Sequence, residues 1–278
     1  MPAWCTVRST IGCTDGGVLG KPQREVKSAI AKRDMISDQY VWFVWSSAFL
    51  VPWLAAYVTF PQQRKVMVWA SLFTMPFGLT EPIFVPAYWS PPSLFDLART
   101  TGFDIESFIF SFGIGGIGAV LYNMVTRRQI APLPNEERHS PRHKLHNWAL
   151  GVPFVSFPIL FLFPWNPIYP AIVAIGLGAT AAIWCRPDLA RKTWIGSVLF
   201  MTYYIIFLIG VEWTNPGYIA RVWNLGALSG LTIAGMPIEE LLFAAAFGAY
   251  WSGVYDHFTW QRLIHTAGRG AAASCIPR

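Results

Sequence analysis

Five glutamates stand at the ends of long apolar segments in this 278-residue chain, where a charged side chain is costly unless it is paired or used. They are Glu81, Glu106, Glu212, Glu239 and Glu240. Carboxyl groups gathered in an apolar environment cannot all ionise, because desolvation and mutual repulsion keep some of them protonated. A protonated acid beside a carboxylate can donate one proton and remove another. The set therefore predicts acid–base chemistry on an apolar substrate, or proton-coupled transport.

Two of the glutamate-bearing segments are diverged copies of each other. Residues 105–110 read IESFIF and residues 238–243 read IEELLF, at an offset of 133 positions. Upstream of them, Trp89 aligns with Trp223, one position out of register. The chain therefore carries one acidic feature twice.

Helix initiation is the simpler explanation of these acids. Pro237 suits the first position of a helix, and Glu239 in the first turn would favour the helix dipole by roughly 0.3–1 kcal/mol. This explanation does not cover Glu81 and Glu212, because both are expected at helix C-termini, where the dipole disfavours a carboxylate. We therefore interpret the five glutamates as a functional cluster.

The composition indicates that the apolar segments cross a membrane as helices. The chain is 54% hydrophobic and 13% charged, whereas typical soluble domains are about 25% charged. A helix needs roughly 20 residues to cross the hydrocarbon core, while the strands of outer-membrane barrels are only about 10 residues long and alternate. Seven segments have the composition of membrane helices: 40–60, 66–85, 105–126, 147–164, 169–185, 194–212 and 232–254.

The basic residues fall mainly on one side of a seven-helix arrangement. That side holds Arg64, Lys65, Arg127, Arg128, Arg138, Arg142, Lys144, Arg186, Arg191, Lys192, Arg262, Arg269 and Arg278. The opposite connections hold only Arg99 and Arg221. This bias is typical of a multi-pass cell-membrane protein and predicts a cytoplasmic C-terminus. It also explains the formal charge of +6 without nucleic acid as a partner.

The fold class that follows is an all-α membrane protein. Its seven transmembrane helices are expected to form two parallel three-helix repeats, about 40–126 and 169–256, joined by a linking helix at about 147–164. Residues 35–260 would form the membrane domain and residues 261–278 a cytoplasmic tail. All five glutamates then lie near the external boundary.

Residues 1–34 do not fit this arrangement. They place six basic residues on the external side and lack the apolar core of a signal peptide. Either they form a polar, disordered extension, or translation begins at Met35. We favour the start at Met35, since it removes the conflict.

No metal and no bound cofactor are expected. The four cysteines share no metal-like spacing; His139, His143 and His146 could share a helix face as ligands, but a solvated basic loop explains them better. Residues 113–118 match G-x-G-x-x-G inside an apolar segment, where small residues permit close helix packing rather than dinucleotide binding. No lysine lies inside the seven segments, which excludes a retinal Schiff base.

Taken together, these features resemble the small membrane-integral lycopene cyclases of actinobacteria, archaea and fungi. The hallmark of that family is a hydrophobic-Pro-hydrophobic-Glu-Glu motif that opens an apolar helix, and residues 236–240 (MPIEE) match it. Trp251, Tyr255 and His257 resemble the end of the same helix in the family. The first copy departs from the motif, since residues 104–107 (DIES) lack the proline and the second glutamate.

The resemblance implies an intramolecular lyase, or isomerase, that acts without a cofactor on lycopene or a related linear carotenoid in the bilayer. A carboxylic acid would protonate the terminal double bond, an alkene would attack the cation, and a carboxylate would remove a proton to leave an ionone-type ring. Glu239 or Glu240 is the expected acid, with Glu106 and Glu81 as base or charge stabilisers. Glu212 completes the expected catalytic set. Association with other carotenoid-biosynthesis enzymes would fit the same context.

Two rival functions stay open at this point: a seven-helix, parallel-repeat transporter, and a non-catalytic carotenoid-binding membrane subunit. A transporter needs a polar pathway across the whole membrane. The expected helices offer little polar lining on the cytoplasmic half apart from Asn123 and Asp256.

Overall fold

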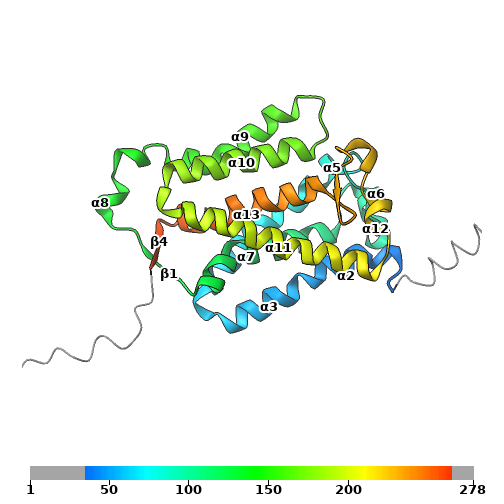
Figure 1. Cartoon of the computed structure of the whole chain (residues 1–278), viewed down its shortest axis with the longest axis horizontal. Helices are drawn as coiled ribbons and strands as arrows, with labels where there is room; N and C mark the ends of the chain where they lie inside the picture. Colours follow the sequence, from blue (N-terminus) through cyan, green and yellow to red (C-terminus); the bar gives the residue numbers. More distant parts are fainter. Residues whose placement is uncertain (1–34, 265–278) are drawn as a thin grey trace, which may run out of the picture. The chain divides into compact units, whose positions relative to one another are not determined.

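The computed structural model describes residues 35–264. The predicted extension at residues 1–34, three of the four cysteines, and the tail from residue 265 onward lie outside the described residues. Helices dominate the described part (Figure 1). The α-helices are α2 (Asp38–Ala48), α3 (Leu50–Thr59), α4 (Arg64–Thr74), α5 (Glu81–Phe84), α6 (Leu97–Thr101), α7 (Ile105–Thr126), α8 (Asn135–Arg138), α9 (His146–Phe161), α10 (Ile168–Cys185), α11 (Ala190–Thr214), α12 (Tyr218–Val222) and α13 (Ile238–Phe258).

Short 3₁₀ helices and strands complete the described chain. The 3₁₀ helices are η1 (Pro61–Gln63), η2 (Met75–Thr80), η3 (Leu94–Asp96), η4 (Pro141–His143), η5 (Pro187–Leu189) and η6 (Leu225–Ala227). The strands are β1 (Gln129–Pro132), β2 (Thr232–Ile233), β3 (Met236–Pro237) and β4 (Gln261–Ile264). Strand β1 pairs antiparallel with β4, and β2 pairs antiparallel with β3.

Within residues 35–264, four helical stretches are long and apolar enough to cross a membrane. They are Asp38–Thr59, Ile105–Thr126, Ile168–Cys185 and Pro187–Thr214. They coincide with the first, third, fifth and sixth expected segments, so the prediction of a helical protein built for a membrane is confirmed. The linking helix α9 is only 16 residues long and contains Pro153 and Pro158. The complete seven-helix repeat arrangement stays a prediction.

The second expected segment is not one helix. It is divided into α4, η2 and α5, with Pro76 at the first break. A proline has no backbone N–H to donate and its ring clashes with the preceding turn, so it weakens an α-helix and favours a break at this point. As a result Glu81 opens α5. The expectation that Glu81 ends a helix is therefore wrong, and the helix-dipole argument does not apply to it.

The seventh expected segment begins as a hairpin. Strands β2 and β3 pair around Ala234 and Gly235, whose φ angles of 51° and 83° are left-handed. Glycine adopts such angles without strain, which makes a tight turn here and delays the helix. Helix α13 then starts at Ile238, with Pro237 just before it rather than in its first turn, and continues to Phe258.

Helices α7 and α13 lie at the centre of the packing. Helix α13 packs against α10, α11 and α7, and α7 packs against α4 and α2; Figure 1 shows α13 between α10 and α11. A Cβ atom on Gly115 of α7 would lie 1.6 Å from Thr74 Oγ1 of α4. The glycines at 113–118 therefore serve close helix packing, as the sequence predicts.

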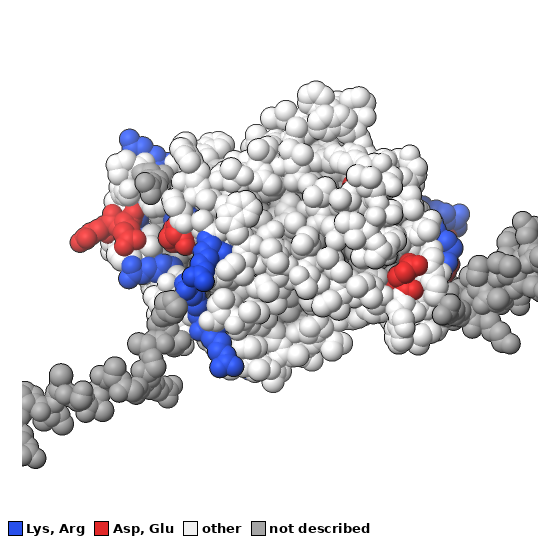
Figure 2. All heavy atoms as spheres, in the orientation of Figure 1, with Lys and Arg blue, Asp and Glu red and all other residues white. Residues whose placement is uncertain are grey.

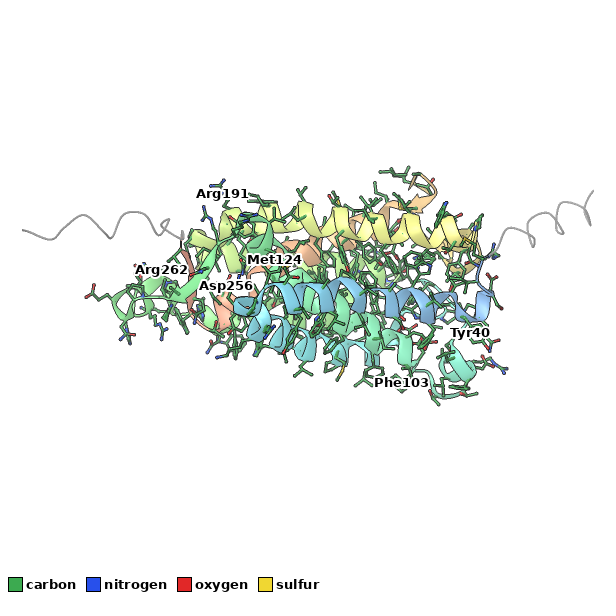
Figure 3. The ribbon with its side chains drawn as sticks, turned by 90° about the horizontal axis from the view of Figure 1, so that it is seen from below. Tyr40, Phe103, Met124, Arg191, Asp256 and Arg262 are labelled. Carbon is green, nitrogen blue, oxygen red and sulfur yellow. The ribbon has the colours of Figure 1, made fainter. Side chains whose placement is uncertain are left out.

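Both central helices begin at the same end of the described unit. Phe103, which precedes α7, lies at one end with Tyr40, whereas Met124, Arg191, Asp256 and Arg262 lie at the other (Figure 3). Helices of this length extend about 30 Å, so the heads of α7 and α13 both lie at the Phe103 end. Figure 2 shows Lys, Arg, Asp and Glu gathered at the two ends, with an uncharged belt between them on the visible face. Such a belt suits the hydrocarbon core of a bilayer.

The polar residues near the Arg191 end are paired with each other. Helix α11 begins four residues earlier than expected and so includes Lys192, which is 1% exposed and lies 2.5 Å from Asp256. The expected absence of lysine from these helices is therefore wrong, but its ammonium group is held in a buried ion pair. Asn123 Nδ2 donates to Gln63 Oε1 at 3.1 Å. The two polar residues considered for a transport pathway thus form local pairs.

Candidate active site

Glu240, the third residue of α13, is held by three side-chain donors. The hydroxyl of Tyr204 in α11 donates to Oε2 at 2.7 Å. Trp223 Nε1 donates to Oε1 at 2.6 Å, and the hydroxyl of Tyr88 donates to the same oxygen. Both carboxylate oxygens are therefore fixed in position within a buried, aromatic environment.

Glu239 points in a different direction from its neighbour, as two successive helical residues must, being about 100° apart. Its Oε1 accepts from the hydroxyl of Tyr169 in α10 and from the backbone N–H of Ser229, both at 2.8 Å. The two bonds attach α10 and the loop before β2 to the head of α13. Glu239 and Glu240 are both buried.

Three acids gather at the head of α7, in the first copy. Asp104 caps the helix by accepting from the backbone N–H of Ser107 at 2.5 Å. The Ser107 hydroxyl donates to Glu81 Oε2 at 2.7 Å, and Glu106 Oε1 accepts from the backbone N–H of Leu94 at 2.7 Å. Glu81, Asp104 and Glu106 therefore form a second carboxyl cluster, which we call the α7 acid group.

Each member of the α7 acid group has one buried oxygen left over. Glu81 Oε1, Asp104 Oδ2 and Glu106 Oε2 are enclosed and make no hydrogen bond within the part of the chain that the structure describes. Buried polar atoms are rarely left in this condition outside sites that do chemistry or store strain. Burial raises the pKa of Asp104 above its ordinary value. The group is thus suited to keep a proton.

A chain of tryptophan rings joins the two acidic sites. Trp42 of α2 lies next to Asp104 and meets Trp89 edge-on, with ring centroids 4.6 Å apart. Trp89 lies 5.4 Å from Trp223, which donates to Glu240. Electron-rich ring faces stabilise a nearby cation, by about 0.5–2 kcal/mol according to how dry the site is.

The backbones of Trp89 and Trp223 also pair with each other, in an isolated antiparallel bridge. Ser90 N–H donates to Val222 O, and Asn224 N–H donates to Tyr88 O, each at 2.9 Å. The two connections that the duplication aligns therefore meet side by side. This contact brings Tyr88, from the first half of the chain, to Glu240 in the second.

Glu212 has a different position from the other four glutamates. It lies near the end of α11, half-buried, and accepts from the backbone N–H of Gly217 and from that of Ile219 at 3.3 Å. These bonds hold the turn into α12, which leads to Trp223. The geometry therefore gives Glu212 contacts with the backbone of a turn, one connection away from Glu240.

Sequence reasoning did not identify Tyr88, Tyr204, Trp223 or Asp104 as site residues. The alignment of Trp89 with Trp223 was a signal for the tryptophans, but nothing in the spacing selects the two tyrosines. Burial and the Glu240 carboxylate both raise the pKa of Tyr88 well above its ordinary value, so its hydroxyl keeps its proton and stays a donor.

Comparison with known protein families identifies the second half of this site. Residues 166–258 match the family model described as lycopene cyclase. These residues, in the second half of the chain, are therefore similar to lycopene cyclases. No curated protein and no solved structure matches the chain. The matched lycopene cyclase region includes Glu212, Glu239 and Glu240, together with the donors Tyr204 and Trp223; the α7 acid group precedes it. This similarity supports an enzyme that cyclises a lipophilic carotenoid.

Proposed function

We propose that this protein is a lycopene cyclase that closes the ends of a linear carotenoid into ionone-type rings by proton transfer within the membrane. The observation that carries the proposal is Glu240, a buried carboxyl group held by Tyr88, Tyr204 and Trp223 inside the family-matched region. Such an arrangement positions a proton-exchanging group in a dry, aromatic surround.

The reaction is balanced without an oxidant or a reductant. A carboxylic acid adds a proton to the terminal double bond, which leaves a tertiary cation. The neighbouring double bond attacks that cation, so a carbon–carbon bond closes the ring and the positive charge moves onto the ring. A carboxylate then removes a ring proton and restores a double bond. One proton enters and one leaves, so the product is an isomer of the substrate.

The chain supplies a group for each requirement. Glu240 exchanges a proton with the substrate, while its three donors hold the two oxygens in place. The α7 acid group supplies a second set of carboxyls, in which three buried acids near one another retain at least one proton. Trp42, Trp89 and Trp223 stand between the two sites and stabilise the positive charge. Glu212 positions the turn that leads to Trp223.

We further propose that the two acidic sites act as one shared site on one carotenoid end at a time. All the acids lie towards one end of the described unit, whereas a linear carotenoid is comparable in length to the roughly 30 Å hydrocarbon core. The two ends of one extended molecule would then cyclise in sequence, with the substrate leaving and re-entering between steps.

The test is expression of the chain in a bacterium that accumulates lycopene, followed by chromatography of the pigments. One-ringed and two-ringed carotenoids are the expected products, identified as β or ε by their spectra. Cells with an empty vector control for the host background. Unchanged lycopene, in cells where the protein is present in the membrane, would exclude the proposal and favour a carotenoid-binding subunit.

A further inference from the structure

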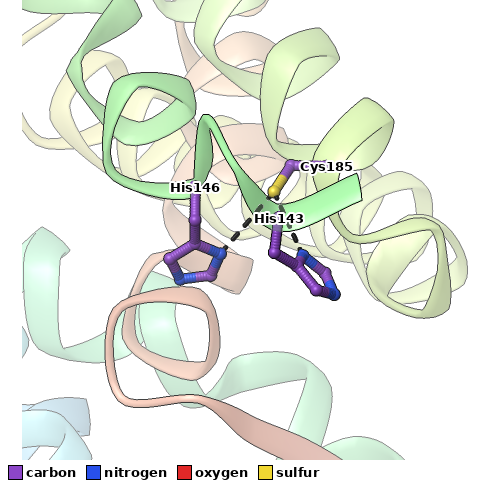
Figure 4. A group of neighbouring side chains, drawn as sticks. All are labelled: His143, His146 and Cys185. Atoms are coloured by element: carbon purple, nitrogen blue, oxygen red, sulfur yellow. Dashed lines mark hydrogen bonds between the residues drawn. The ribbon is translucent and has the colours of Figure 1, made fainter. Parts of the chain in front are cut away.

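Three potential metal ligands converge near the ends of α13 and α10 that lie away from the acids, and Figure 4 shows their side chains. They are His143 in η4, His146 at the start of α9, and Cys185 at the end of α10. Cys185 Sγ lies 3.5 Å from His143 Nδ1 and 3.6 Å from His146 Nδ1, and the three atoms lie within 4.8 Å of one another. Cys185 follows His146 by 39 residues, which explains why the sequence pattern favoured a solvated loop over a metal site.

The ring of His146 is positioned by contacts with His257 and Trp260. Its Nε2 lies 2.9 Å from the carbonyl oxygen of His257. A carbonyl can only accept, so Nε2 carries the proton and Nδ1 presents a lone pair. Trp260 stacks on one face of the ring at 3.6 Å, and the ring of His257 lies 4.0 Å away. A backbone carbonyl that holds the second nitrogen of a histidine is the usual support of a metal ligand, because it orients the ring and makes it more basic.

The two sulfur–nitrogen distances agree with a tetrahedral zinc ion. Bond lengths of about 2.3 Å to sulfur and about 2.0–2.1 Å to nitrogen, at the tetrahedral angle, separate the sulfur from each nitrogen by about 3.6 Å. Both observed separations are close to this value. A thiol can donate its single proton to only one of the two nitrogens, so hydrogen bonding alone would need His143 to donate to sulfur in turn.

The surroundings are compatible with a cation. Arg186, next to Cys185, carries a positive charge beside the site, and its guanidinium is bound by Asp188 at 2.8 and 2.6 Å and by the carbonyl of Gln261 at 2.8 Å. Its positive charge is therefore balanced locally. A surface pocket of about 250 Å³, bordered by His143 and Glu137, gives access from solvent.

We propose that His143 Nδ1, His146 Nδ1 and the Cys185 thiolate bind one Zn²⁺ ion, with the fourth position open to this pocket. Binding replaces the thiol proton, which is released to solvent. The ion joins the connection between α7 and α9 to the end of α10. This site is separate from the carotenoid site and does not depend on the proposed cyclase activity.

The experiment uses the full chain, purified in detergent with an affinity tag that contains no histidine. Elemental analysis should find about one zinc per chain, as a single three-ligand site requires. Replacement of zinc by Co²⁺ should give the intense near-ultraviolet band of a thiolate–cobalt bond. Cys185→Ser should abolish that band, and His143→Asn should weaken zinc binding roughly tenfold or more.

Two variants serve as matched controls. Cys275→Ser removes another cysteine, and His139→Asn removes another histidine of the same loop; neither should change the zinc content. The zinc content and cobalt spectrum of the wild-type protein test the proposal even if a variant fails to fold. A wild-type protein without zinc and without a thiolate–cobalt band, whose thermal transition is unaffected by a chelator, would overturn the proposal and leave a hydrogen-bonded Cys–His group.

Discussion

Tyr204 donates a hydrogen bond to Glu240 at 2.7 Å, and so joins α11 to the head of α13. Its neighbour Tyr203 is half-buried, and the enclosed Tyr203 hydroxyl has no hydrogen-bond partner among the residues that the structure describes. The two tyrosines therefore offer adjacent, chemically identical groups of which only one contacts the proposed catalytic carboxyl.

Tyr204→Phe should lower cyclisation, since it keeps the ring and removes one of the three donors to Glu240. A hydrogen bond to a charged group is worth about 1.5–3 kcal/mol, which corresponds to a loss of roughly tenfold to a hundredfold if it serves the reaction. Tyr203→Phe should leave the rate unchanged. The measurement is the initial rate of pigment formation per amount of membrane protein. Equal rates in both variants would show that Tyr204 has no part in positioning Glu240.

Glu240→Gln should abolish cyclisation while the protein still accumulates in the membrane. Glutamine keeps the shape of the side chain but cannot exchange a proton, and general acid–base catalysis contributes about 10²–10⁴-fold. Glu239→Gln should also reduce activity, but less, because Glu239 accepts bonds that hold a loop. Glu136→Gln, at an exposed position of α8, is the control. Full activity of both Glu239→Gln and Glu240→Gln would show that these residues only cap the helix.

Glu106→Gln distinguishes a shared site from two separate ones. In the wild type, a one-ringed carotenoid should appear early and then decline as the two-ringed product rises. If the α7 acid group and Glu240 act together, the variant slows both steps alike. A time course of pigments provides the measurement. Accumulation of the one-ringed product alone would mean that each acidic site serves its own end of the substrate.

The orientation in the membrane can be tested with single cysteines at exposed positions. Residue 99 lies in a connection expected outside, and residue 136 in the basic connection expected in the cytoplasm. In a chain that lacks Cys5, Cys13 and Cys275, a membrane-impermeant thiol reagent applied to intact cells should label Arg99→Cys and not Glu136→Cys. The opposite labelling would invert the topology and move the acids to the cytoplasmic side.

Gly115→Ala should destabilise the protein. Its new methyl group would meet Thr74 Oγ1 at 1.6 Å and the carbonyl oxygen of Ala70 at 2.9 Å, so α4 and α7 would have to separate. Overpacking of this kind costs about 1–3 kcal/mol. Gly176→Ala, in α10, is the matched control, because nothing lies within 4 Å of its Cβ position. Thermal unfolding in detergent compares the two, and equal midpoints would contradict the close packing.

The helices were predictable wherever one apolar segment corresponds to one helix. Helix α7 has the expected bounds, 105–126, because its apolar residues are uninterrupted and Asp104 caps its start. The predicted start of α13 is six residues too early, because the β2–β3 hairpin contains apolar residues that extend the apolar segment of the helix. The break before Glu81 is not predicted, because the segment 66–85 is expected to form one helix despite Pro76 and Pro82.

The site could be predicted only in part, for a physical reason. Each glutamate was noticeable by itself, as a charge beside an apolar segment. Tyr88, in a connection, and Tyr204, in an apolar segment, were not, because a tyrosine in either place is ordinary and its role depends on which carboxyl group the tertiary fold brings to it. The same is true of Cys185, whose histidine neighbours come from another connection.

The three donors to Glu240 come from widely separated parts of the chain: Tyr88 from the first half, Tyr204 from α11, and Trp223 from the connection before α13. Glu240 itself lies in the last long helix. During synthesis the donors emerge first and have no carboxylate to hold until α13 takes its place among α7, α10 and α11. An unfinished chain that ends before α13 therefore holds the three donors without the acid. If Glu240 acts as proposed, proton transfer can begin only after the final helix has docked, so the catalytic group would form in the last step of folding.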